Sequence, residues 1–220
     1  MALVISGCLK KDIPQKDTAQ CNTESFPQQT YEPYPIQTKT INGTDYLMSR
    51  SPAGKYGGTL VTSTIGEGPK TFNSWNSMDA TSSQAADIMF DALVSTDPYT
   101  GEVYPKMAKS IKVLPDKKTY IIELRHGLKW SDGKPITADD VYFTWNTIIF
   151  GGFGNTSTRD AMYIGDELPK IEKIDKYTVK FTTPKPFSPF LRQLGVPIAP
   201  KHILEPVTKQ GKRAFASFWS

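Results

Sequence analysis

Cysteine and histidine are scarce in this sequence of 220 residues, and long apolar runs are missing from it. Both cysteines, Cys8 and Cys21, lie in the first tenth of the chain, so a bond between them would not cross-link the rest. Two thiols also fall short of the four ligands that a structural zinc site requires. Because no run of about 18 apolar residues occurs, the printed sequence contains no candidate for a membrane-spanning helix.

Strong charge of one sign is lacking as well. Lysine and arginine number 26 against 22 aspartates and glutamates, which gives a formal net charge of +4 at pH 7. Residues 201–220 hold four basic residues and one acidic residue, and elsewhere the two signs alternate. A nucleic-acid binder usually carries a basic stripe with exposed aromatics, so we expect no nucleic-acid partner. The 38% of hydrophobic residues is typical of a globular protein.

The common catalytic patterns are missing too. The only imidazole bases are His126 and His202, which we expect to be surface or capping residues, and no Gly-x-Ser-x-Gly motif accompanies them. Residues 131–134 match Ser-x-x-Lys, but the Asp-Gly-Lys-Pro sequence at 132–135 predicts a turn, whereas that chemistry needs a helix. No metal-ligand spacing occurs either. We therefore expect no enzymatic activity, no cofactor and no metal.

Alternating patterns predict strands. Tyr120, Ile122 and Leu124 alternate with more polar neighbours, which indicates a strand over residues 119–125 with one face in water. Residues 178–182 alternate in the same way. The β-rich run at 59–64 predicts a first strand of the folded body, followed by a loop with two glycines and a proline.

Two helices are predicted from apolar stripes and capping residues. The first runs from about Ser83 to Val94 with Thr81 or Ser82 as its cap, and the second begins at Thr137. Two aspartates in the first turn of the second helix favour its dipole. The apolar stripes consist of Ala85, Met89, Ala92 and Leu93 in the first helix, and of Val141, Trp145, Ile148 and Ile149 in the second. Mixed strands and helices predict an α/β or α+β fold.

The N-terminus resembles the lipobox of bacterial lipoproteins. Residues 5–8 read Ile-Ser-Gly-Cys, and lipidation requires small residues before a thiol that carries the lipid. Residues 9–56 are polar and proline-rich, which predicts a tether. We therefore expect Cys8 to be a lipid-attachment site. The alternatives are an ordinary buried thiol or a disulfide between Cys8 and Cys21.

A longer resemblance lies in the body. Residues 130–141 read WSDGKPITADDV, and residues 124–128 before them read LRHGL. Together they resemble the signature of the family 5 extracellular solute-binding proteins, the oligopeptide- and dipeptide-binding components of ABC importers. Further matches follow in the family's order at residues 56–60, 69–73, 89–94, 175–181 and 200–204.

The resemblance implies an α/β fold of the type II periplasmic-binding-protein kind. Because family members are much longer and fold as two lobes, we expect part of the first lobe with its inserted subdomain, and the second lobe to be absent. The expected organisation is a truncated lipoprotein signal at 1–8, a tether at 9–56 and an incomplete N-terminal lobe at 57–220. We expect such a chain on its own to bind peptides no more tightly than about millimolar.

The implied function is capture of peptides, or of a related small solute, outside the cytoplasm and delivery to ABC permease subunits. The implied location is the periplasm or cell surface, with a lipid anchor in the membrane. The alternatives are a lipid-anchored adhesin or scaffold domain, or a nonfunctional fragment of a transporter gene.

The expected ligand-binding residues lie in the loop after the first predicted strand, because ligands of open α/β sheets bind beyond the carboxyl ends of strands. An alternative is that residues 69–73 merely turn the chain and pack one aromatic ring. The expected set is Glu67, Gly68, Pro69, Thr71, Phe72 and Asn73.

Overall fold

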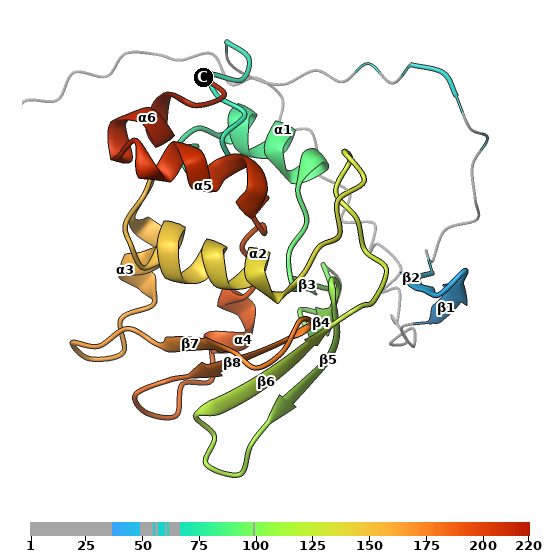
Figure 1. Ribbon diagram of the computed structural model, residues 1–220, viewed down its shortest axis with the longest axis vertical. Helices are drawn as coiled ribbons and strands as arrows, with labels where there is room; N and C mark the ends of the chain where they lie inside the picture. The colour runs from blue at the N-terminus through green and yellow to red at the C-terminus, as the bar shows by residue number, and fades with distance from the viewer. Residues whose placement is uncertain (1–36, 49–54, 56, 60, 62–66, 99) are drawn as a thin grey trace, which may run out of the picture. The chain divides into compact units, whose positions relative to one another are not determined.

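A four-stranded antiparallel sheet in the order β5-β6-β8-β7 forms one layer of the folded body (Figure 1). The computed structural model describes residues 37–48, 55, 57–59, 61, 67–98 and 100–220. The strands are β5 (Ala108–Val113), β6 (Thr119–Leu124), β7 (Lys170–Lys173) and β8 (Thr178–Thr182). The two predicted strands at 119–125 and 178–182 are therefore confirmed, and the first of them ends one residue early.

The alternating residues of β6 and β8 bury one face of this sheet. Tyr120 pairs with Phe181 across the two strands, and Ile122 pairs with Val179. All four side chains are buried. Pairs of this kind between neighbouring strands are the unit that stabilises a sheet.

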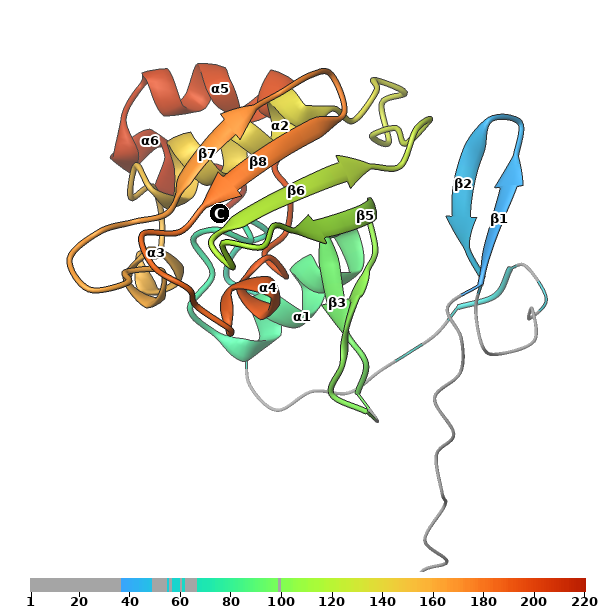
Figure 2. The same ribbon diagram turned by 90° about the horizontal axis from the view of Figure 1, so that it is seen from below.

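The buried face is covered by α2 (Ala138–Tyr142) and the π-helical segment η1 (Phe143–Ile149) that continues it (Figure 2). All members of the predicted stripe in this helix are buried, and the ring of Trp145 meets that of Phe181 edge-on at 5.5 Å. Two further helices, α5 (Lys201–Lys209) and α6 (Lys212–Ser217), lie beyond α2 in Figure 1. The prediction of a helix that begins after Thr137 is confirmed.

The first helix of the body, α1 (Ala80–Met89), does not have the predicted bounds of 83–94. Its cap is Asp79, whose carboxylate accepts a hydrogen bond from the backbone N–H of Ser82 at 2.8 Å. The predicted caps therefore lie inside the helix, since an aspartate three residues earlier satisfies the free N–H group first.

The predicted apolar stripe of α1 is also wrong. Met89 is 51% exposed at the end of the helix, and the inward positions belong to Ser82 and Ala86. Ala92 and Leu93 are buried, but they follow the helix as extended chain that leads into β3. These two residues are apolar because the extended segment is buried, and their positions match a helical stripe only by chance.

Smaller elements complete the described residues. Two antiparallel pairs are β1 (Thr38–Ile41) with β2 (Thr44–Leu47), and β3 (Val94–Thr96) with β4 (Val103–Pro105). Two short helices are α3 (Ser157–Ala161) and α4 (Phe190–Gln193). The first pair lies within the stretch for which only a tether was predicted. Its turn consists of Asn42 and Gly43, both with positive φ, which is a typical hairpin turn.

Some sequence predictions fall outside the described residues. Cys8 and Cys21 do so, as does most of the predicted strand at 59–64, of which only Thr59 and Val61 are described and lie in no strand. The proposed division at residues 8 and 56 stays a prediction. No described helix has both the length and the apolar content that crossing a membrane requires.

Candidate functional site

The loop that precedes α1 contains the predicted ligand-binding residues, and it divides into buried and exposed parts. Thr71 is 8% exposed and Asn73 is fully buried. Phe72 between them is 46% exposed. The alternation means that neighbouring side chains of one loop have different roles.

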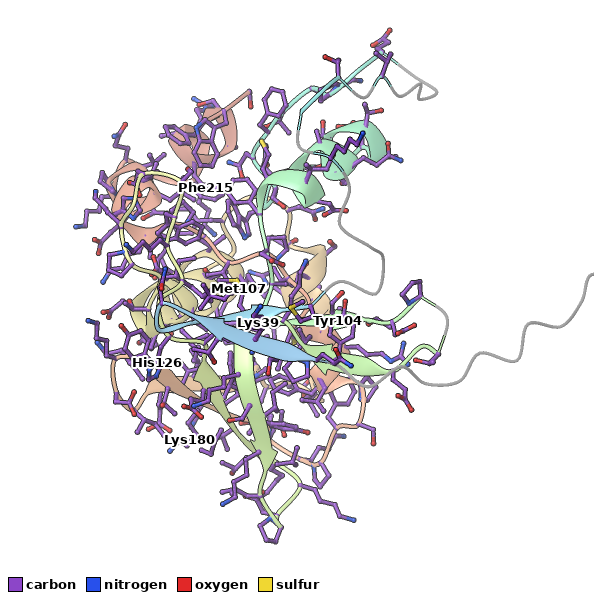
Figure 3. The ribbon with its side chains drawn as sticks, turned by 90° about the vertical axis from the view of Figure 1, so that its right-hand side faces the viewer. Lys39, Tyr104, Met107, His126, Lys180 and Phe215 are labelled. Carbon is purple, nitrogen blue, oxygen red and sulfur yellow. The ribbon has the colours of Figure 1, made fainter. Side chains whose placement is uncertain are left out.

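Asn73 holds the loop against α6. Its Nδ2 donates a hydrogen bond to the carbonyl of Phe215 at 2.8 Å, and its Oδ1 accepts one from the N–H of Trp75 at 3.2 Å. Phe215 lies on α6 and is labelled in Figure 3. Close by, the Asn76 amide donates to the carbonyl of Ala216 at 2.9 Å. Both polar atoms of the Asn73 side chain are therefore used inside the protein.

The backbone on the other side of Phe72 is fixed in the same way. The N–H of Phe72 donates to the carbonyl of Trp219 at 2.9 Å, and the Thr71 hydroxyl donates to that same carbonyl at 3.3 Å. Ser82 on α1 accepts hydrogen bonds from the N–H groups of Lys70 and Thr71. The loop is therefore attached to α1 and to the residues that follow α6.

The groups that the loop presents to solvent are Glu67, Pro69, Lys70 and the ring of Phe72, all of which are exposed. Gly68 has φ +85, in the left-handed region that favours glycine, and a methyl group built on it meets nothing within 4 Å. Of the six predicted residues, the structure thus brings Thr71 and Asn73 into the protein and leaves the others at its surface.

Two cavities lie elsewhere on the body. The larger, about 540 Å³, is bordered by α1, β3 and α4, and the smaller, about 220 Å³, is lined in part by Trp75 and Phe153. Neither is lined by any of the six predicted residues. Sequence patterns gave no signal for them, because their lining residues come from segments far apart in the chain.

The signature segment at 130–141 acts as a structural connection. Thr137 caps α2, because its hydroxyl accepts a hydrogen bond from the Asp139 N–H. The Asp140 carboxylate in turn accepts one from the Thr137 N–H at 2.9 Å. The other Asp140 oxygen accepts from the N–H of Lys201, the first residue of α5, at 3.1 Å. One buried carboxylate thus joins the starts of two helices.

The turn within the signature also contacts α5. Asp132 accepts hydrogen bonds from the Lys134 N–H at 3.1 Å and lies 2.7 Å from Nε2 of His202. The backbone N–H of Lys134 and then His202 hold the pKa of the Asp132 carboxyl below its ordinary value. Gly133 has φ +84, as the predicted turn requires.

Each histidine contacts a neighbouring side chain. His202 pairs with Asp132 as described, and the exposed His126 stacks on the ring of Tyr177 at 4.4 Å. Within the described ranges, no three His, Cys, Asp or Glu side chains lie together as metal ligands would.

Similar proteins were found for most of this body. The chain is 33% identical over 155 residues to a probable ABC transporter-binding protein of Deinococcus radiodurans, which covers 69% of this chain and 26% of that relative. It is 34% identical over 160 residues to the oligopeptide-binding protein AppA of Bacillus subtilis, which covers 71% and 28%. The chain therefore spans just over a quarter of the length of these curated relatives.

A solved structure of one of these relatives also matches the chain. The structure of AppA from Bacillus subtilis in complex with a nonapeptide matches 70% of this chain and 29% of that chain, with 31% identity and a TM-score of 0.56. The α/β fold is that of the type II periplasmic binding proteins, as the sequence resemblance implies. The family described as bacterial extracellular solute-binding proteins, family 5 (middle part), matches residues 102–217, just over half of the chain. This chain belongs to family 5 of the bacterial extracellular solute-binding proteins.

Proposed function

We propose that this chain is part of the substrate-binding component of an ABC importer, which captures peptides or a related small solute outside the cytoplasm and delivers them to the permease. The observation that carries the proposal is the family match over residues 102–217. It is supported by the relatives that are named as oligopeptide-binding and ABC transporter-binding proteins. Such capture needs no covalent chemistry, so we propose that the chain is not an enzyme.

The loop at 67–73 is proposed as one wall of the solute site. The Glu67 carboxylate can accept hydrogen bonds from N–H groups of a peptide, and the exposed Phe72 ring offers an apolar surface. Gly68 and Pro69 shape the turn between these two side chains. Thr71 and Asn73 act differently, because their hydrogen bonds to the segment 215–219 hold Phe72 outward.

Peptide uptake in the organism that carries this gene tests the proposal. Deletion of the gene is expected to lower the uptake of labelled di- to pentapeptides, and the intact gene is expected to restore it. The variant Phe72→Ala is expected to raise the peptide concentration for half-maximal uptake about tenfold, since a buried aromatic anchor contributes strongly to binding. Tyr163→Ala is a matched control, because Tyr163 is 44% exposed and lies outside the loop.

Two results would count against the proposal. Unchanged peptide uptake after deletion would contradict the importer function. Normal uptake by Phe72→Ala and by Glu67→Gln, in cells where deletion abolishes uptake, would instead contradict only the placement of the site in this loop.

We propose further that Cys8 carries a lipid that anchors the protein to a bacterial membrane, with residues 9–56 as tether and the solute-binding body from residue 57 onward. The support is the Ile-Ser-Gly-Cys sequence at 5–8 and the polar, proline-rich stretch after it. Labelled palmitate should enter the protein and should be lost in Cys8→Ser but kept in Cys21→Ser. Equal labelling of the Cys8→Ser variant would refute the anchor.

A further inference from the structure

Two basic side chains from different elements converge on Gly152, a buried residue in the loop between η1 and α3. A methyl group built on Gly152 would lie 2.7 Å from Nη1 of Arg159 and 3.3 Å from Nζ of Lys212. The sum of these distances limits the separation of the two cationic nitrogens to about 6 Å. Gly152 has φ +69, so the backbone here adopts a conformation that suits glycine, and any larger residue would meet the two cations.

The loop that holds Gly152 is fixed against the rest of the protein. The Phe153 ring meets the buried Phe215 ring edge-on at 5.6 Å, which places the loop against α6. The N–H of Asn155 donates to the carbonyl of Trp75 at 2.8 Å. The two cations therefore lie beside a well-anchored segment, and little ordering of the backbone is needed before a ligand binds.

Arg159 is partly neutralised by Asp160, which leaves a net charge of one positive unit at this place. The Asp160 carboxylate accepts hydrogen bonds from Nε and Nη2 of Arg159, at 3.2 and 3.0 Å. The nitrogen that faces Gly152 is the remaining one, Nη1. Within the described ranges, no carboxylate forms an ion pair with Lys212. Like charges this close repel each other, and an anion bound between them would remove that cost.

We propose that Arg159 and Lys212 form a binding site for a doubly charged oxyanion, such as inorganic phosphate, sulfate or a phosphomonoester group. Guanidinium and ammonium groups are strong donors to such oxygens. With Asp160 paired to Arg159, one positive charge remains, and by Coulomb's law it attracts a doubly charged anion about twice as strongly as a carboxylate with a single charge. The proposed solute loop bonds to Phe215 and Trp219, whereas none of its residues is among the atoms nearest to Gly152, so the two proposed sites use different side chains.

A nuclear magnetic resonance titration of the 220-residue chain tests the site. Sodium phosphate and sodium sulfate are added at constant ionic strength, with sodium chloride as the reference, while the amide signal of Gly152 is followed. A saturable shift with a dissociation constant of about 1 mM is expected. Lys212→Gln should weaken binding about tenfold, because it removes one charge-assisted hydrogen bond.

The matched control is Arg213→Gln, which removes the same charge one residue further along α6, where the side chain points about 100° away. This variant should change the dissociation constant by less than about twofold. An equal loss in both variants, or a shift that never saturates, would show diffuse attraction only and would overturn the proposal. Saturable binding of sodium acetate as tight as that of phosphate would overturn the assignment to a doubly charged anion.

A lipid headgroup is a second source of phosphate, and it is distinguished by its single charge. When vesicles of phosphatidylglycerol are sedimented, they should carry down equal amounts of the unmodified chain and of Lys212→Gln, because the proposed site prefers an anion with two charges. Loss of vesicle binding in Lys212→Gln, without any binding of free phosphate, would overturn the proposal in favour of a membrane contact.

Discussion

The sheet region, in which β5–β8 pack against α2 and η1, and the loop region at 67–73 are each stabilised by a different kind of interaction. Between the sheet and the helical layer of α2 and η1, buried apolar side chains such as Trp145 and Phe181 fill the space. The loop before α1 is instead tied down by polar side chains, and the bond from Asn73 to Phe215 spans 142 residues of sequence. Apolar packing tolerates small displacements, whereas hydrogen bonds need defined geometry. The position of the loop at 67–73 therefore depends on residues 215–219, far along the sequence.

The apolar side of this comparison is tested by Phe181→Ala. Phe181 is fully buried in β8 and contacts Trp145 and Phe190. Its removal should lower the free energy of unfolding by about 3–5 kcal/mol, measured by urea denaturation. Phe72→Ala is the control, because this ring is partly exposed and its loss should change stability by less than about 0.5 kcal/mol. Similar losses in both variants would contradict the contrast between the regions.

The polar side is tested by Asn73→Ala. The change removes the Asn73 bond to the buried carbonyl of Phe215, which keeps only the N–H of Phe218 at 3.3 Å, and it takes the acceptor from the N–H of buried Trp75. It should lower the free energy of unfolding by about 2 kcal/mol in the same assay. Asn76→Ala removes a comparable amide that is only partly buried and should cost less than about 1 kcal/mol. If Asn73→Ala had no effect, the loop would not depend on α6.

A smaller effect is expected at the start of α2. Thr137→Ala removes the helix cap and should lower the free energy of unfolding by about 1 kcal/mol, measured by thermal or urea denaturation. Thr137→Ser keeps a hydroxyl that can cap and should restore most of the loss. A Ser variant as unstable as the Ala variant would show that the methyl group, rather than the cap, is important.

The smallest expected effect is on the loss of folding stability at low pH. The folded protein lowers the pKa of Asp132 below 3.8, chiefly through the Lys134 N–H and then through His202. Because its pKa is lower in the folded protein, the ionised Asp132 carboxylate stabilises the fold above pH 3.8. This stabilisation is lost as the pH falls through the pKa of the folded state. Asp132→Asn should therefore lose less stability than the unmodified chain between pH 5 and about 3. Asp166→Asn, at another exposed aspartate, should follow the unmodified chain.

The ease of prediction from sequence differs between the two regions for the same physical reason. In the sheet region, the alternation of Tyr120, Ile122 and Leu124 is local and reports burial directly. In the loop region, the partners of Asn73 lie far along the chain, and no local pattern encodes such a bond. The role of Asn73 in placing the loop was therefore missed, although the residue itself was among the expected ligand-binding ones.

The π-helical hydrogen bonding of η1 determines how this segment responds to the loss of a residue. In η1, the N–H of Phe150 bonds to the carbonyl of Trp145, five residues back, where an α-helix would use four. Each hydrogen-bonded loop of this kind encloses one residue more than an α-helical loop. The wider segment absorbs that extra residue, so deleting one residue from 143–149 would allow α-helical bonding while the residues after it keep nearly the same facing. Sequences related to this one should therefore accept the loss of one residue in η1 more readily than a loss elsewhere in the helix.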